Sequence, residues 1–196
     1  MYLYGASGHA KVIIDILQAN NENIEALVDD NPQLSSLHDI TVVHSAEGCS
    51  PMIVSIGNNT IRKKIVEQLI NHNFGRAIHP SAILSPYATV GDGSVVMQGA
   101  IIQSDAQVGK HCIINTGATI DHDCKIEDFV HISPNSSLCG NVQVGEGTQV
   151  GAGSVVVPGV KIGKWCLITA GSVVTTDIPD YSLATGNRCK VIKSLK

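Results

Sequence analysis

An unbroken six-residue period runs through the second half of the chain and constrains its fold more than any other feature. Every sixth residue from Ile78 to Val174 is aliphatic, and the residue four positions later is mostly small, as at Ala100, Ala118 and Cys124. A hexapeptide period is typical of a parallel β-helix, in which three short strands and three corners make a coil of about 18 residues. The period therefore predicts nearly six such coils with aliphatic side chains inside.

The interior of this β-helix must be narrow, because aromatic residues make up only 4% of the chain. Cys112, Cys124 and Cys166 fall at the small inward position, and the first and last of them lie three coils, or about 14 Å, apart. A disulfide needs Cα atoms within about 7 Å, so we expect buried thiols in a reduced, cytoplasmic protein. The formal charge of −4 comes without a basic cluster, and we find no signal peptide or membrane-length apolar run. We therefore expect neither nucleic acid nor a membrane as a partner.

The first part of the chain lacks the six-residue period and has a different pattern of apolar residues, which predicts a small α/β domain. Short apolar strands alternate with amphipathic helices, as in a parallel sheet; the strands are expected at 2–4, 24–28 and 52–56, and the helices at 10–18 and 60–71. The chain then divides into an α/β domain (1–76), a β-helix (77–178) and a C-terminal tail (179–196). Because the end coils of a β-helix need covers, we expect the α/β domain to cap the first coil and the tail to cap the last.

Three strand ends of the α/β domain carry glycine or polar residues. Gly5-x-x-Gly8 and His9 follow the first strand, Asp29-Asp30 end the second, and Gly57 follows the third. The carboxyl ends of parallel strands meet at one edge, where α/β proteins bind ligands, and a helix N-terminus there favours anions. This arrangement predicts a nucleotide site, with the loop and His9 toward phosphate or sugar and the aspartates toward base or ribose. The alternative is a tight turn without a ligand, since one glycine of the dinucleotide fingerprint is missing.

Histidines interrupt the repeat of the β-helix. His122 lies at a corner between Asp121 and Asp123, whose carboxylates can orient the imidazole and raise its basicity. One coil further is Gly140, whose accessible N–H is a candidate donor to an oxyanion. We expect His111 to be an ordinary surface or hydrogen-bonded histidine. A metal site made by His111, His122 and His131 lacks a recognisable ligand spacing, so no metal is expected.

Over nearly its whole length the chain resembles the nucleotide-sugar acetyltransferases of the PglD/NeuD type. The resemblance is carried by Tyr2–His9 (YLYGASGH), Asp29-Asp30, Ile56–Lys64 (IGNNTIRKK) and Asn115–Asn141. It implies a Rossmann-like α/β domain followed by a left-handed β-helix. It also implies a homotrimer with acetyl-CoA in the groove between neighbouring β-helices, acting in bacterial glycan biosynthesis.

The resemblance further assigns roles to individual residues. By position, His122 matches the general base, and Asp123 matches the acid that raises its basicity, although the family usually has a glutamate there. Three residues match contacts to acetyl-CoA: His131, Ala152 and Ala170. Six residues match the nucleotide-sugar site: Ser7, Gly8, His9, Asp29, Asp30 and Gly57. The tail departs from the family, because Gly186–Cys189 stands where relatives have Gly-x-Pro-Ala.

The resemblance, taken with these residues, implies direct transfer of an acetyl group from acetyl-CoA to the amine of a UDP-linked 4-amino-4,6-dideoxy sugar. His122 would accept the amine proton, and the Gly140 N–H would stabilise the oxyanion. Three alternatives stay open. They are an O-acetyltransferase of the sialic-acid type, a metal-dependent hydratase resembling carbonic anhydrase, and a nucleotide-sugar-binding module without catalysis.

Overall fold

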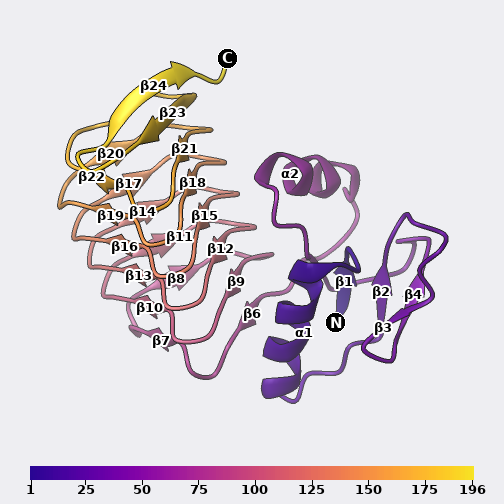
Figure 1. The fold of residues 1–196 in the computed structure, drawn as a ribbon. Coiled ribbons are helices and arrows are strands. Elements are labelled where there is room, and N and C mark those ends of the chain that lie inside the picture. The colour runs from indigo at the N-terminus through magenta and orange to yellow at the C-terminus, as the bar shows by residue number, and fades with distance from the viewer.

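The computed structural model describes all 196 residues, which form an α/β region beside a parallel β-helix (Figure 1). The α/β region contains β1 (Tyr2–Tyr4), α1 (Gly8–Ala19), β2 (Ala26–Val28), β3 (Ser36–Leu37), β4 (Ile40–Val43), β5 (Met52–Val54) and α2 (Asn59–Gln68). Its sheet has the order β3-β4-β2-β1-β5 and is parallel except for β3. The predicted strands and helices are present with shifted ends, whereas the β3–β4 hairpin was not predicted.

The β-helix consists of two-residue strands joined by short turns. They are β6 (Ala77–Ile78), β7 (Ile83–Leu84), β8 (Thr89–Val90), β9 (Val95–Val96), β10 (Ile101–Ile102), β11 (Gln107–Val108), β12 (Ile113–Ile114), β13 (Thr119–Ile120), β14 (Lys125–Ile126), β15 (His131–Ile132), β16 (Ser137–Leu138), β17 (Gln143–Val144), β18 (Gln149–Val150), β19 (Val155–Val156), β20 (Lys161–Ile162), β21 (Leu167–Ile168) and β22 (Val173–Val174). Every third strand joins the same parallel sheet. We name the three sheets after their first strands, as the β6, β7 and β8 sheets.

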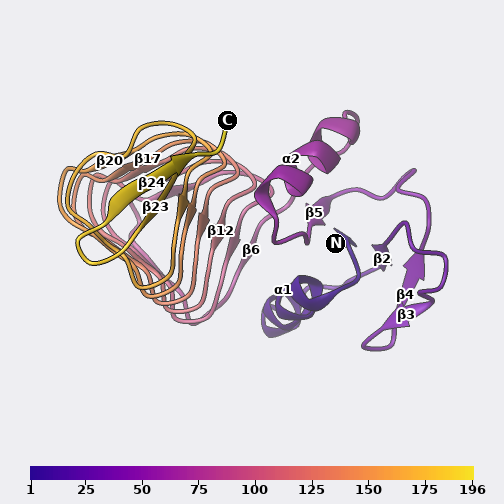
Figure 2. The ribbon, with the colours of Figure 1, turned by 45° about the horizontal axis from the view of Figure 1, so that its top comes forward.

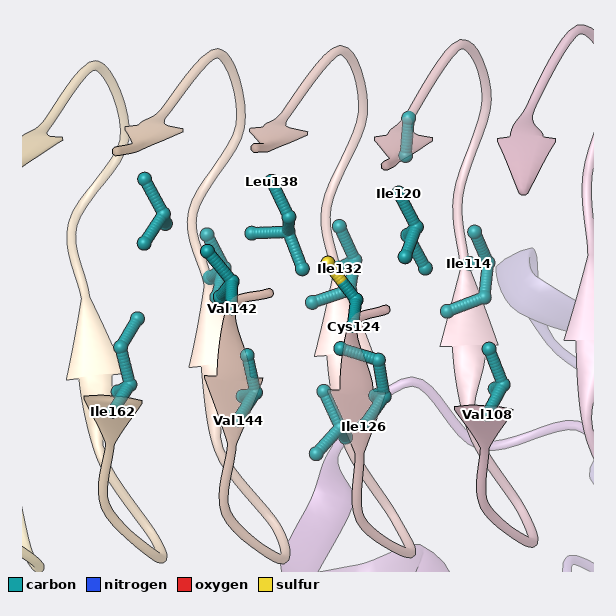
Figure 3. Close-up of a cluster of buried hydrophobic side chains, with 14 of the residues drawn as sticks. Val108, Ile114, Ile120, Cys124, Ile126, Ile132, Leu138, Val142, Val144 and Ile162 are labelled. Atoms are coloured by element: carbon teal, nitrogen blue, oxygen red, sulfur yellow. The ribbon is translucent and has the colours of Figure 1, made fainter. Parts of the chain in front are cut away.

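Each strand pairs with the strand one coil away, so that Ile102, Ile120 and Leu138 lie in register. Successive residues of a strand point to opposite faces, and the aliphatic second residue points inward, as the period predicts. Figure 3 shows these side chains stacked in rows inside the β-helix. The small inward positions hold Cys112, Cys124 and Cys166, which are buried and free.

The corners between strands are two-residue turns with a repeated hydrogen-bond pattern. The second residue has a left-handed backbone, for example Asp123 (φ 59°) and Asn141 (φ 58°). The N–H of this second residue donates a hydrogen bond to the carbonyl of the first turn residue one coil earlier. Asn141, for example, donates to the His122 carbonyl at 2.9 Å. This pattern gives no backbone partner to the N–H of the first turn residue. Some corners therefore expose a free backbone donor.

The α/β region packs against the side of the β-helix. Outward residues of the β6 sheet, such as Val95 and Ile113, share a core with Ile13 of α1, and Figure 2 shows both helices beside this sheet. Our expectation that this region caps the first coil is therefore wrong, and the inward side chains of Ile78 and Leu84 stay partly exposed. The reason is that the outward residues of β6, β9 and β12, which are Ala77, Val95 and Ile113, are themselves apolar and need covering.

The C-terminal tail covers the last coil. Strand β23 (Ser182–Thr185) pairs in parallel with β21, and β24 (Lys190–Ser194) pairs antiparallel with β23. Figure 2 shows both strands lying across the end of the β-helix. None of the helices has the length and apolar character that crossing a membrane requires.

Candidate active site

The imidazole of His122 is held at a corner between the β7 and β8 sheets. Its Nδ1 lies 2.7 Å from the Asp123 carboxylate, and its backbone N–H donates to Asp121 at 2.8 Å. The hydrogen bond to Asp123 and the charge of Asp121 raise the pKa of His122. Because Nδ1 donates to the carboxylate, the other ring nitrogen, Nε2, is left to accept a proton. The aspartate thus reaches the ring although it is shorter than the family's glutamate.

Gly140 lies directly against this ring. A Cβ atom at this position would be 2.7 Å from Cε1 and Nε2 of His122, so the close approach of the imidazole requires glycine. Gly140 is the first residue of its turn, and its N–H makes no hydrogen bond in the structure. A hollow of about 520 Å³ adjoins both groups and is lined by Asp121, His122, Cys139, Gly140, Asn141, Pro158 and Gly159. A proton acceptor and a free backbone donor therefore share one open pocket.

A second corner, between the β6 and β7 sheets, carries the predicted contacts to acetyl-CoA. Ala152 and Ala170 are first turn residues one coil apart, joined by the bond from the Gly171 N–H to the Ala152 carbonyl at 2.8 Å. Both alanines are exposed, and their N–H groups make no hydrogen bond in the structure. This corner thus offers a row of backbone donors.

His131 lies on β15, next to that corner. Its Nε2 accepts from the Asn115 side chain at 3.1 Å, which leaves the proton on Nδ1, and that buried nitrogen has no partner. Burial and the charges of Arg62 and His9 lower the pKa of His131 to about 3. His131 is therefore a neutral donor, unlike His122.

The glycine loop lies at the start of α1. Ser7 precedes the helix and its side chain caps nothing. No atom lies within 4 Å of where a Cβ would stand on Gly8 or Gly57, so both positions are open. His9 has a buried Nε2 without a partner, and burial, with the charge of Arg62, lowers its pKa to about 4. Open glycines beside an unpaired neutral imidazole are suited to a polar ligand.

The two aspartates after β2 are engaged within the protein. Asp29 accepts the Ala6 N–H at 2.8 Å and the Asn31 N–H at 3.0 Å. Asp30 accepts the hydroxyl of Tyr4 at 2.9 Å, and burial together with this bond raises the pKa of Tyr4 to about 12. Asp29 therefore holds the glycine loop in place, a role that we did not predict.

The predicted site residues form two groups. One contains the glycine loop together with His131, close enough that a charge on His9 lowers the pKa of His131. The other contains His122, Asp123 and Gly140, and no residue of the α/β region lines its pocket. Within one chain, the candidate base does not face the candidate nucleotide loop.

His111 differs from our expectation of a surface or hydrogen-bonded histidine. It is 5% exposed, it stacks on Phe129 with ring centroids 5.1 Å apart, and its Nδ1 has no partner. The physical reason is that this corner of the β-helix packs against α2 and Phe74. No three His, Cys, Asp or Glu side chains are grouped so that they could hold a metal ion.

Sequence reasoning also missed the polar contacts that join α2 to the β-helix. Asn59 donates to the Gly147 carbonyl at 3.0 Å, and Arg62 donates to the His111 carbonyl at 2.9 Å. Both residues are buried, although the helix has several apolar side chains. The signal was present in the motif Ile56–Lys64, which carries polar residues three positions apart.

Comparison with known proteins agrees with both parts of the fold. Residues 1–69 match the PglD N-terminal domain family, and residues 96–194 match the GMPPB C-terminal domain family. A curated UDP-N-acetylbacillosamine N-acetyltransferase from Bacillus subtilis is 39% identical over 107 residues, which are 48% of this chain. The match spans 50% of the length of that relative.

Two solved structures are similar over almost their whole length. A histidine-to-asparagine variant of perosamine N-acetyltransferase from Caulobacter crescentus, in complex with CoA and GDP-perosamine, has a TM-score of 0.94 and 39% identity, covering 98% of this chain and 96% of that one. The acetyltransferase domain of PglB from Neisseria gonorrhoeae, in complex with acetyl coenzyme A, has a TM-score of 0.89 and 34% identity, covering 97% and 98%. The chain therefore belongs to the PglD-type family of acetyl-CoA-dependent sugar N-acetyltransferases.

Proposed function

We propose that this protein transfers an acetyl group from acetyl-CoA to the amine of a nucleotide-linked 4-amino-4,6-dideoxy sugar. The observation that carries this proposal is the His122 imidazole, held by Asp123 at 2.7 Å and lying against the free N–H of Gly140. UDP is our choice of nucleotide, and the GDP-perosamine bound by the Caulobacter crescentus relative makes GDP the first alternative to test. The free cysteines and the need for acetyl-CoA fit a cytoplasmic enzyme.

In this mechanism the amine nitrogen attacks the thioester carbonyl carbon while Nε2 of His122 takes the amine proton. The carbonyl π electrons move to oxygen, and the Gly140 N–H donates to the resulting oxyanion. Collapse of the intermediate breaks the carbon–sulfur bond, and the leaving thiolate receives the proton from His122. General base catalysis contributes typically about 10²–10⁴-fold, and one oxyanion donor about 3–4 kcal/mol.

Acetyl-CoA would lie along the corner that carries Ala152 and Ala170. Its pantetheine arm contains amide carbonyls, which accept hydrogen bonds from free backbone N–H groups. The neutral His131, whose buried Nδ1 has no partner within the chain, lies beside this corner. The expected coenzyme contacts are therefore chemically suited to this molecule.

We take the proposed enzyme to be a homotrimer, as the family resemblance implies, and the separation of base and glycine loop within one chain supports a site shared between copies. The β7 sheet lies between the corner of His122 and the corner of Ala152, and its outward residues carry no charge: Ile83, Ile101, Thr119, Ser137, Val155 and Val173. The β8 sheet, in contrast, exposes Lys125 and Lys161. This uncharged face lies next to both groups of site residues and is suited to contact with a second copy of the chain. The His122 of that copy would complete the site.

Three structural details belong to the same proposal. They are a left-handed winding of the β-helix, a Rossmann-like character of the α/β domain, and the division into residues 1–76, 77–178 and 179–196. The parallel order β4-β2-β1-β5 supports the second detail, and the start of β6 at Ala77 supports the first domain boundary. Light scattering tests the trimer, and mixing His122→Ala with Gly8→Glu subunits tests the shared site, because hybrid trimers should regain activity that neither variant has alone.

Release of CoA with a panel of sugars tests the function. The panel contains UDP-, dTDP- and GDP-linked 4-amino sugars, each beside its 4-hydroxyl analogue. We expect turnover with one amino sugar and little with its hydroxyl analogue, whereas the reverse would indicate an O-acetyltransferase. His122→Ala should lose most of kcat while calorimetry still detects the nucleotide sugar. Near-normal turnover by this variant, or no CoA release with any sugar, would refute the proposal.

A further inference from the structure

A positive charge, the guanidinium of Arg62, is buried where the α/β region meets the β-helix. The residue is 1% exposed and forms no salt bridge. It donates to the carbonyls of Ile56 (2.9 Å), Gly57 (3.3 Å), His111 (2.9 Å) and Phe129 (3.0 Å), and to the Asn59 side chain (2.8 Å). An arginine has five N–H donors in a rigid fork. Every donor therefore has an acceptor, and none of the acceptors is a carboxylate.

Burying a cation without an ionic partner is unfavourable. Burial lowers the pKa of Arg62 to about 10, so the group stays charged at neutral pH. An apolar side chain would fill this position without the cost of removing a charge from water. What the guanidinium adds is geometry, because its planar fork fixes five acceptors relative to one another.

The acceptors come from two parts of the molecule. Ile56 and Gly57 form the loop after β5, which is one side of the proposed nucleotide site. His111 and Phe129 lie one above the other in successive coils, so their carbonyls mark a fixed height along the β-helix. Arg62 thus connects the nucleotide loop to a defined position on the β-helix.

Neighbouring residues of α2 strengthen this connection. Asn59 donates to the Gly147 carbonyl, and the Lys63 ammonium lies 5.8 Å from the Phe129 ring and 5.4 Å from the Trp165 ring. Figure 1 shows α2 beside the middle coils, near β15 and β18. Asn59, Arg62 and Lys63 are spaced i, i+3 and i+4, so one face of the helix contacts the β-helix.

We infer that Arg62 is a positioning residue, which fixes the Gly57 loop on the β-helix. A bound nucleotide sugar would then present its amine at the coil where the corner of His122 lies. This inference rests on the proposed function. It assigns Arg62 no contact with either substrate. Replacing Arg62 should therefore slow acetyl transfer only to a substrate that is bound by the α/β domain.

Arg62→Lys tests this inference, because a lysine keeps the charge but cannot reach five acceptors in one plane. Two substrates that accept the acetyl group are compared at saturating acetyl-CoA. One is the nucleotide-linked amino sugar, and the other is the same amino sugar without its nucleotide, at high concentration. We expect kcat/KM for the nucleotide sugar to fall about tenfold or more, as a displacement of the order of 1 Å can produce. Transfer to the free sugar, and KM for acetyl-CoA, should change less than about twofold.

Lys64→Met is the matched control. It removes a cation from the exposed side of the same helix, where Lys64 makes no hydrogen bond or salt bridge, and it should leave both rates unchanged. If Arg62→Lys does not fold, Asn59→Ala weakens the same connection and should reproduce the selective loss. Equal losses of kcat/KM for the nucleotide sugar and the free sugar, or no loss for either, would overturn the inference. Absence of transfer by the wild-type enzyme would instead refute the proposed function.

Discussion

Gly140→Ala should impair catalysis by moving the His122 imidazole rather than by unfolding the protein. The new methyl carbon would lie 2.7 Å from Cε1 and Nε2 of the ring, whereas ordinary van der Waals contact begins at 3.4 Å. The ring must therefore retreat by about 0.7–1 Å. A misplacement of about 1 Å can cost on the order of 100-fold in rate, so we expect kcat to fall about 100-fold.

The stability of this variant should change little. Gly140 does not have a left-handed backbone, so alanine is allowed there, and the displaced ring is more than half exposed and free to move. The substitution also lowers the entropy of the unfolded chain, which stabilises by about 0.4–1 kcal/mol at compatible positions. The free energy of unfolding from urea titration should therefore stay within about 1 kcal/mol of the wild type. The backbone N–H survives, so the measurement isolates the position of the ring.

A double-mutant cycle shows whether the glycine acts through the imidazole. In a His122→Ala background there is no ring to displace, so adding Gly140→Ala should cost little further activity. The assay is CoA release at saturating concentrations of both substrates. A kcat within twofold of the wild type for Gly140→Ala would refute the argument, and so would a further loss of about 100-fold in the double variant.

Three further predictions concern charge, acid stability and the core. Asp123→Asn replaces the charged acceptor of the hydrogen bond that raises the pKa of His122 with a neutral amide, so the acidic limb of the kcat/KM profile should move to lower pH while kcat falls. Burial lowers the pKa of His111 from 6.5 to about 4, so stability should decrease as pH falls below about 6.5. The loss should reach about 2 kcal/mol at pH 5, and His111→Gln should remove this contribution in urea titrations at pH 7.5 and 5. Ile120→Ala opens a cavity at a fully buried position and should cost about 2–5 kcal/mol, whereas Ile70→Ala, at an 84% exposed position, should cost under about 0.5 kcal/mol.

The β-helix was predictable from the sequence because one short rule governs every coil. An aliphatic residue at each sixth position, such as Ile114 or Ile120, must point inward, and the pairing one coil away follows from the period. The same rule is enough to place Gly140 one coil from His122. Repetition makes the register certain, since a slip would turn a whole row of aliphatic side chains outward.

Helix α2 shows where this reasoning fails. Its apolar residues suggest a buried face, yet Ile61 is exposed, and the most buried positions are Asn59 and Arg62. The spacing of apolar residues does not reveal a helix whose side chains contact the β-helix by hydrogen bonds to its backbone carbonyls. For the same reason, the sequence did not predict that the two groups of candidate site residues lie apart within one chain. That separation depends on which side of the β-helix the α/β region covers.

The histidines differ in pKa because of their surroundings. His111 is buried and His9 and His131 are half-buried near the cationic Arg62, and each has a lowered pKa and a buried ring nitrogen without a partner. His122 lies in solvent between two carboxylates, and its pKa is raised. A general base at neutral pH needs both basicity and a free lone pair. Among these four histidines only His122 has both, which supports the proposal that His122 is the group that accepts the amine proton.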